Sequence, residues 1–302
     1  MANLYLWEID WGGRSMDKYY LGCPIWGNKA WVNNFFSSDA KPGKFLAQYA
    51  SAFNTVEGNT TFYGLPGKET IAKWHDATPF HFQFAFKFPR TISHDKSLTN
   101  TEADVDRFLE LMAPLESRLG PFFLQLPPGF VDFPALERFL IKLPPDFQYA
   151  VEARNPGFYD EFIWDFDQLL TDLNMDRVIF DTRRLMSYET QDVEIRESKR
   201  KKPKTPVLPG ATGPRPFLRY VGRPNPEEDV AALKEWAHHV AGWINEGRTP
   251  YVFMHQAPDD DLAPQLCQLF HHLLQEILPE LEPLPPWPFD LEEKPGEQLE
   301  LF

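Results

Sequence analysis

The chain has 302 residues, of which 43% are hydrophobic and 15% aromatic, so it can bury a large core, and a disordered main body is excluded. Its formal net charge of −14 argues against attraction of the whole surface to nucleic acid or an anionic membrane, but a local basic patch is compatible with it. No apolar stretch approaches the roughly 18 residues that a membrane span requires. Without a signal-like start, the sequence predicts a cytoplasmic protein with no membrane partner, whose cysteines, Cys23 and Cys267, are reduced and packed.

Short apolar runs rich in β-branched and aromatic residues alternate with segments of helical period. After an irregular lead-in over residues 1–18, the predicted strands cover residues 19–26, 55–59, 82–87, 122–125, 149–154, 178–181, 217–222 and 252–255. The predicted helices cover residues 67–76, 102–118, 133–143, 159–174, 226–246 and 262–278. A continuous apolar run is typical of a parallel strand buried on both faces, and eight such units close into a barrel. The sequence therefore predicts an α/β fold, a (β/α)8 TIM-type barrel over residues 19–278.

Two stretches depart from this alternation. Residues 187–216 predict a long mobile loop in place of the sixth helix. This loop carries the basic residues Arg196, Lys199, Arg200, Lys201, Lys202 and Lys204. Two interpretations of it stay open, a solvated charged loop and a flap that contacts phosphate at the barrel mouth. Residues 279–302 are rich in proline and acidic residues, which is the composition of a flexible linker.

Nearly every predicted strand ends in a charged or amide residue, and barrel enzymes keep their sites at the ends of the strands. Side chains two residues apart on a strand share a face, which pairs Glu57 with Asn59, Glu152 with Arg154, and Asp181 with Arg183. If the first of each pair points into the mouth, three carboxylates meet Lys87, Gln125, Arg219 and His255 there. Such a set can run acid–base chemistry, bind a metal, or hold a phosphate or a sugar. The alternative is a structural layer of ion pairs that caps the barrel.

A metal site is one possibility at this mouth. The candidate ligands are Glu57, His94, Glu152, Asp181 and His255, and two histidines with three carboxylates suit Zn²⁺ or Mn²⁺. No H-x-x-x-H or C-x-x-C spacing supports it. The chain also lacks G-x-G-x-x-G, G-x-x-x-x-G-K-[ST] and G-x-S-x-G, so no motif indicates a nucleotide cofactor or a serine hydrolase. A divalent metal is therefore the cofactor that the sequence leaves open.

Several motifs match those of a known family. The sequence reads LGCPIW at 21–26, FNTVEGNTTFY at 53–63, FAFKFPR at 84–90, LQLPP at 124–128 and VEAR at 151–154. Over about residues 19–277 the chain resembles the YecE-like family, also called domain of unknown function 72. The resemblance implies a (β/α)8-type barrel and no particular reaction. It places the family's polar pattern at Glu57, Asn59, Lys87, His94, Gln125, Glu152, Arg154, Asp181 and Arg219, and this chain departs from the family at residues 24–26 and 255–256.

The end of the sequence carries a second resemblance. Gln298, Leu299, Leu301 and Phe302 match the pentapeptide Q-L-x-L-F, by which bacterial replication and repair proteins dock on the sliding clamp. A flexible linker would present this peptide, whose apolar side chains fill a groove on the clamp. The alternative is an apolar end that folds back onto the barrel.

The sequence favours an enzyme at the barrel mouth, a metal-assisted or acid–base hydrolase acting on a phosphate-bearing or nucleic-acid-derived substrate. Residues 298–302 would link it to DNA replication or repair through the sliding clamp. The predicted catalytic residues are Glu57, Glu152 and Asp181. The predicted substrate-binding residues are Asn59, Lys87, His94, Gln125, Arg154, Arg219 and His255. Two alternatives remain, a metabolic enzyme acting on a small sugar or sugar phosphate and an adaptor that binds a ligand without turnover.

Overall fold

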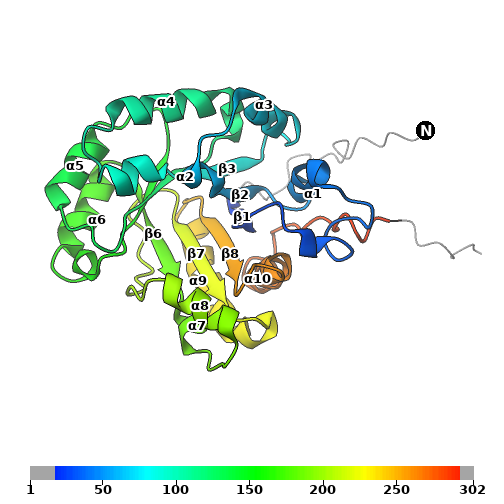
Figure 1. The fold of residues 1–302 in the computed structure, drawn as a ribbon. Helices are drawn as coiled ribbons and strands as arrows, with labels where there is room; N and C mark the ends of the chain where they lie inside the picture. The colour runs from blue at the N-terminus through cyan, green and yellow to red at the C-terminus, as the bar shows by residue number, and fades with distance from the viewer. Residues whose placement is uncertain (1–17, 293–302) are drawn as a thin grey trace, which may run out of the picture.

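Eight parallel strands form the centre of the molecule (Figure 1). The computed structural model describes residues 18–292. The strands are β1 (Tyr20–Cys23), β2 (Thr55–Gly58), β3 (Gln83–Phe86), β4 (Phe122–Gln125), β5 (Tyr149–Glu152), β6 (Asp176–Asp181), β7 (Phe217–Gly222) and β8 (Tyr251–Gln256). They pair in the order β3-β2-β1-β8-β7-β6-β5-β4, and a bridge from Lys87 to Phe123 joins the β3 and β4 edges. The predicted TIM-type barrel is confirmed.

Helices surround this barrel (Figure 1). They are α1 (Phe45–Ala50), α2 (Thr60–Tyr63), α3 (Lys68–Asp76), α4 (Glu102–Met112), α5 (Phe133–Ile141), α6 (Ile163–Asp172), α7 (Arg183–Ser187), α8 (Val193–Lys201), α9 (Val230–Asn245) and α10 (Ala263–Ile277). Six of them correspond to the predicted helices, with small shifts at their ends. Within the described part of the chain, no helix is both long enough and apolar enough to cross a membrane.

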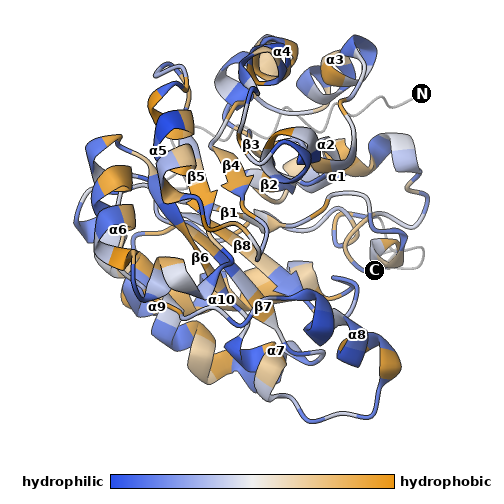
Figure 2. Ribbon diagram, turned by 60° about the vertical axis from the view of Figure 1, so that its left-hand side comes forward, coloured by the Kyte–Doolittle hydropathy of each residue, from blue (hydrophilic) through white to orange (hydrophobic). Residues whose placement is uncertain are grey.

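A compact apolar layer fills the barrel interior. It consists of Ala85, Phe123, Ala150, Val178, Phe217, Tyr251 and Phe253. The alternate residues of the same strands face outward and pack against the helices in a larger core. Figure 2 shows the strands as a largely hydrophobic centre inside helices of mixed character. Because side chains alternate along a strand, a residue two positions beyond the interior layer points toward the barrel mouth.

The connection from β6 to β7 differs from the predicted loop. Residues 193–201 form α8, which begins after a capping aspartate, Asp192. Beyond this helix, residues 202–216 are irregular, so the connection contains two short helices, α7 and α8, and an irregular segment. Arg177 of β6 holds this segment by donating to the carbonyl oxygen of Leu208 (3.1 Å). Most of the basic residues therefore lie on a short capped helix, and the irregular part that follows is tied to the barrel wall.

Residues 279–292 contact the barrel, although their composition predicts a flexible linker. The side chain of Trp287 is 7% exposed and packs edge-on against Phe35, with 5.5 Å between ring centroids. The backbone N–H of Phe289 donates to the carbonyl oxygen of Phe35 (3.2 Å). Burial of Trp287 offsets part of the entropy lost when this segment is ordered. Residues 1–17, in the predicted lead-in, and 293–302, with the clamp-like peptide, lie outside the described residues.

β1 approaches its neighbours closely on both sides. Gly22 pairs with Thr55 of β2, and a Cβ atom at Gly22 would come within 1.9 Å of the Thr55 carbonyl oxygen. On its helix-facing side, the Sγ of Cys23 lies 3.7 Å from the Sγ of Cys267 in α10, and both are buried free thiols. Only glycine leaves room for this strand pairing.

We expect Gly22→Ala to lower the free energy of unfolding by about 3 kcal/mol, because the added methyl overpacks a backbone contact that cannot move aside. Urea unfolding followed by circular dichroism measures the change. Gly27→Ala is the matched control, since a Cβ atom there meets nothing within 4 Å, and it should change stability by less than about 0.5 kcal/mol. Equal stability of the two variants would contradict the packing argument.

Candidate functional site

Polar side chains follow the apolar interior at the carboxyl ends of the strands. Lys87, Gln125, Glu152, Arg219 and His255 each stand two residues beyond a member of the interior layer. Glu57 of β2 joins them, together with two neighbours. We call the eight residues Glu57, Asn59, Lys87, Gln125, Glu152, Arg154, Arg219 and His255 the mouth cluster. The cluster lies at the end of the barrel where TIM-barrel enzymes keep their sites.

Arg219 of β7 is the centre of the mouth cluster. Its Nε and Nη2 donate to the two carboxylate oxygens of Glu57 (2.7 and 2.9 Å), and its Nη1 donates to Glu152 (2.5 Å). The two glutamates are 0% exposed and Arg219 is 5% exposed. Bidentate arginine–carboxylate pairs are strong and fix the orientation of both partners. One guanidinium thus joins β2, β5 and β7 across the barrel.

Further hydrogen bonds satisfy both carboxylates. Asn59 Nδ2 donates to Glu57 (2.9 Å), and His255 Nε2 lies 3.0 Å from the other oxygen of Glu57. Arg154 Nε donates to Glu152 (2.5 Å). Because each carboxylate oxygen has at least one donor beside it, these two side chains act as acceptors for the surrounding cations and amides.

Both carboxylates are ionised at neutral pH. Burial alone would raise the pKa of Glu57, but the charges of Arg219 and then of His255 hold it far below its ordinary value. Burial opposes Arg154 and Arg219 in the same way at Glu152, whose pKa falls to about 2. A carboxylate with so low a pKa is a weak proton acceptor. The geometry therefore indicates that Glu57 and Glu152 position the cations. It does not favour the predicted role of general base for either of them.

Lys87 has a different environment. Its Nζ donates to Gln125 Oε1 (2.7 Å) and lies 3.9 Å from the centroid of the Phe62 ring. No ion pair to Lys87 occurs among residues 18–292. Burial lowers the pKa of Lys87 to about 7, and the nearby charge of Arg219 acts in the same direction. Lys87 is therefore a group of the mouth cluster whose protonation changes near neutral pH.

Asp181 lies outside the mouth cluster, so the three predicted carboxylates do not converge. Its Oδ2 accepts from the indole N–H of Trp236 in α9 (2.8 Å) and from Arg183 (2.8 Å). Val178 and Phe180 are the inward residues of β6, because one is in the interior layer and the other lies under the Arg219 guanidinium. The next residue along the strand therefore faces the surrounding helices.

The candidate metal ligands do not form one site either. Glu57 and Glu152 bind Arg219, whereas Asp181 binds Trp236 behind the barrel wall. In the described part of the chain, no group of three or more His, Cys, Asp or Glu side chains is arranged to hold a metal ion. The donor set at the mouth does not fit a divalent metal, and its cations suit an anion.

His94 and an unpredicted residue, Phe62, border the mouth cluster. The ring of Phe62 lies under the Lys87 ammonium and meets the His94 ring edge-on, with 5.0 Å between centroids. Burial and the charge of Lys87 lower the pKa of His94, which places its imidazole near the cations. Phe62 stands three residues after Asn59 in the motif at the end of β2, but its contact with Lys87 depends on how α2 folds back.

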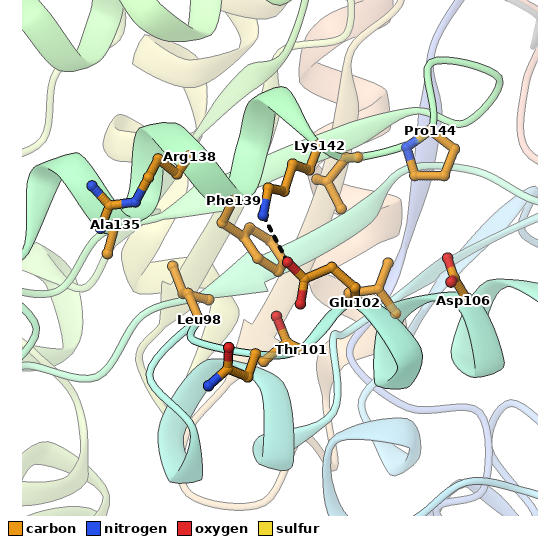
Figure 3. Close-up of a pocket in the computed structure, with 12 residues that line it drawn as sticks. Leu98, Thr101, Glu102, Asp106, Ala135, Arg138, Phe139, Lys142 and Pro144 are labelled. Atoms are coloured by element: carbon orange, nitrogen blue, oxygen red, sulfur yellow. Dashed lines mark hydrogen bonds and ion pairs between the residues drawn. The ribbon is translucent and has the colours of Figure 1, made fainter.

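Two surface depressions lie away from these charges. One, of about 400 Å³, lies between α4 and α5, and Figure 3 shows Lys142 and Glu102 joined across it by an ion pair (2.7 Å). The other, of about 740 Å³, is lined by Arg196, Lys199 and residues nearby on α8 and the turn before it. Neither depression is lined by a residue of the mouth cluster. The strand-end charges therefore define the candidate site.

This structure is an eight-stranded parallel barrel with a buried ion-pair cluster at its mouth. The model of the family described as protein of unknown function DUF72 matches residues 20–288. The UPF0759 protein YecE of Escherichia coli (strain K12) is 37% identical over 273 residues, which cover 89% of this chain and 97% of that protein. The chain belongs to the DUF72 family.

Solved structures of DUF72 family proteins share the fold. The protein from Thermotoga maritima MSB8 is similar with a TM-score of 0.64 at 21% identity, over 86% of this chain and 99% of that one. The protein from Enterococcus faecalis V583 gives a TM-score of 0.60 at 24% identity, over 86% and 97%. At these identities the likeness concerns the barrel alone.

We expect Arg219→Met to lower the free energy of unfolding at neutral pH by about 3–5 kcal/mol, because it leaves two buried carboxylates without their shared cation. Urea unfolding measures this loss. Arg90→Met is the control, since Arg90 forms an exposed pair with Asp95, and such pairs contribute about 0–1 kcal/mol.

The same two carboxylates predict how stability depends on pH. Their pKa values are lower in the folded protein than in the unfolded chain, so their stabilisation is present above the ordinary glutamate pKa of about 4.3. It is lost as the pH falls from there toward the folded-state value of about 2 for Glu152. Unfolding curves at several pH values should show a smaller acid-dependent loss in Arg219→Met than in the wild type. A parallel loss in both proteins would contradict this assignment.

Proposed function

We propose that the barrel mouth binds a phosphate-bearing ligand, and that Lys87 transfers a proton in a reaction on that ligand. The observation that carries this proposal is the cationic face of the mouth cluster. Its two carboxylates are buried and saturated with donors, whereas Arg154 has a side chain that is 16% exposed. Lys87 and His255 are each 8% exposed. An incoming ligand therefore meets nitrogen donors first.

The charge balance of the mouth cluster supports the same conclusion. Arg154 and Arg219 balance the two carboxylates of Glu57 and Glu152, and the protonated form of Lys87 adds an excess positive charge, in a chain whose net charge is −14. Burying an excess cation costs free energy unless an anion compensates it. A phosphate group supplies that charge and several acceptor oxygens.

Lys87 is the group best suited to acid–base chemistry, because a pKa of about 7 lets it both give and take a proton at neutral pH. In the hydrolysis of a phosphate ester, the water oxygen bonds to phosphorus and the ester P–O bond breaks. The leaving oxygen takes the proton of the Lys87 ammonium, and the proton released by the water returns to the amine. Arg154 and Arg219 stabilise the charge on the phosphoryl oxygens.

Sulfate binding tests the anion site, because the charge of sulfate does not change over the pH range of the experiment. We expect the affinity to be constant below about pH 7 and to fall up to tenfold per pH unit above it, since only the protonated Lys87 attracts the anion. Isothermal titration calorimetry from about pH 6 to about pH 9 measures this.

The variants Lys87→Met and Lys142→Met make this test specific. Lys87→Met should bind sulfate at least about tenfold more weakly and lose the pH dependence. Lys142→Met removes an exposed cation paired with Glu102 and should bind as the wild type does. A wild-type protein with no measurable sulfate affinity sinks the proposal.

Turnover separates an enzyme from an adaptor. We expect Lys87→Arg to keep anion binding within about threefold, because arginine keeps the charge, and to lose turnover, because arginine does not release its proton near neutral pH. Phosphate release from a panel of phosphomonoesters, and strand cleavage of single-stranded oligonucleotides, measure turnover. Equal turnover by the wild type and this variant would remove Lys87 from the reaction.

Residues 298–302 carry a second proposal, supported by their sequence, that the protein docks on a bacterial sliding clamp. We expect a fluorescent peptide with this sequence, and the intact protein, to bind a purified clamp with micromolar or tighter affinity. The variant Phe302→Ala should lose this binding because it removes the apolar anchor. Fluorescence anisotropy makes the comparison, and equal anisotropy for both peptides would rule the docking out.

A further inference from the structure

Lys202 is a partly buried lysine just past the end of α8, outside the mouth cluster as defined above. Its Nζ donates to the Ser198 hydroxyl (2.9 Å), and no ion pair to it occurs among residues 18–292. The carbonyl oxygen of the next residue, Pro203, accepts from Thr182 Oγ1 (3.2 Å), directly after β6. These contacts hold Lys202 beside the carboxyl end of β6, at the rim of the mouth.

The charges around Lys202 are those of the mouth. Burial lowers the pKa of Lys202, the carboxylate of Asp260 opposes this, and the charges of Arg219 and Arg154 lower it further. Asp260 accepts from the backbone N–H of Gln256 (2.8 Å) and is partly buried. The charges that act on Lys202 therefore include both arginines of the mouth cluster, and among residues 18–292 its ammonium is bound to the Ser198 hydroxyl and to no carboxylate.

The topology places Lys202 across the barrel from Lys87. In the strand order, β6 is three steps from β3 through β4 and β5, so the carboxyl ends of these two strands lie on different sides of the mouth. Lys87 follows β3, and Lys202 is held beside the carboxyl end of β6. Figures 1 and 2 place α7 and α8, which belong to the β6–β7 connection, on the side of the barrel where β7 lies.

We propose that Lys202 is a further ligand-binding residue. Its ammonium donates a hydrogen bond to the phosphate group that Lys87 binds, so that the β6–β7 connection completes the anion site on the side away from Lys87. A negative charge placed between an ammonium and two guanidinium groups stabilises all three cations. The bound anion supplies that charge. This inference rests on the proposed function. It assigns ligand binding to Lys202, which follows α8, and not to the basic residues within the helix.

The test compares Lys202→Met with Lys201→Met at about pH 6, with sulfate as the probe. Lys201 is the adjacent residue, has a side chain that is 71% exposed and lies 3.8 Å from Glu197. We expect Lys202→Met to weaken sulfate binding roughly tenfold and Lys201→Met to change it by less than about twofold. Lys202→Arg, which keeps the charge, should restore most of the affinity.

The outcomes separate this inference from the proposed function. If the wild type binds sulfate and Lys87→Met loses it, but Lys202→Met binds as the wild type does, the anion site stands and the role of Lys202 is overturned. If Lys201→Met and Lys202→Met weaken binding equally, the effect is general surface charge, which also overturns it. If the wild type does not bind sulfate, both proposals fail. Circular dichroism and thermal unfolding of Lys202→Met show whether a loss of affinity reflects a loss of fold.

Discussion

The guanidinium of Arg219, shared between Glu57 and Glu152, is the interaction on which the rest of the mouth depends. All three groups are buried, and a buried charge is tolerated only when its partners satisfy it completely. The three groups come from three strands, so the ion pairs fix the carboxyl ends of β2, β5 and β7 relative to one another. Because this arrangement uses the glutamates as acceptors, the cations around them keep donors available for something outside the protein.

The barrel mouth gathers positive charge, whereas the chain as a whole is negatively charged. An acidic chain with a net charge of −14 repels polyanions over most of its surface, yet its barrel mouth gathers lysine and arginine side chains. A small anion reaches such a site because a low-dielectric wall strengthens the local field and the distant surface charges are screened by salt. The β6–β7 connection is tied to the barrel at both ends of β6, by Thr182 beside the mouth and by Arg177 at the amino end of the strand.

Much of the fold and part of the site could be read from the sequence because strand residues alternate with a period of two. The interior residues Ala85, Phe123 and Phe217 predict which polar residues come next at the mouth, namely Lys87, Gln125 and Arg219. The same alternation explains why the prediction that Asp181 lies in the mouth was wrong. Its apolar run ends in a polar residue as the others do, but the inward positions of β6 are Val178 and Phe180. The end of a run does not show which of its residues face inward.

The sequence by itself determined the barrel, the eight strands and the polar character of the strand ends, because burial on both faces requires apolar runs of fixed length. Only the tertiary structure decided which of those polar groups meet. Arg219 contacts glutamates 162 and 67 residues away in sequence, and these contacts set which groups are saturated with donors and which titrate near neutral pH. Composition also predicted a linker where Trp287 packs on Phe35. Protonation and packing depend on neighbours brought together by folding, and a linear pattern does not contain them.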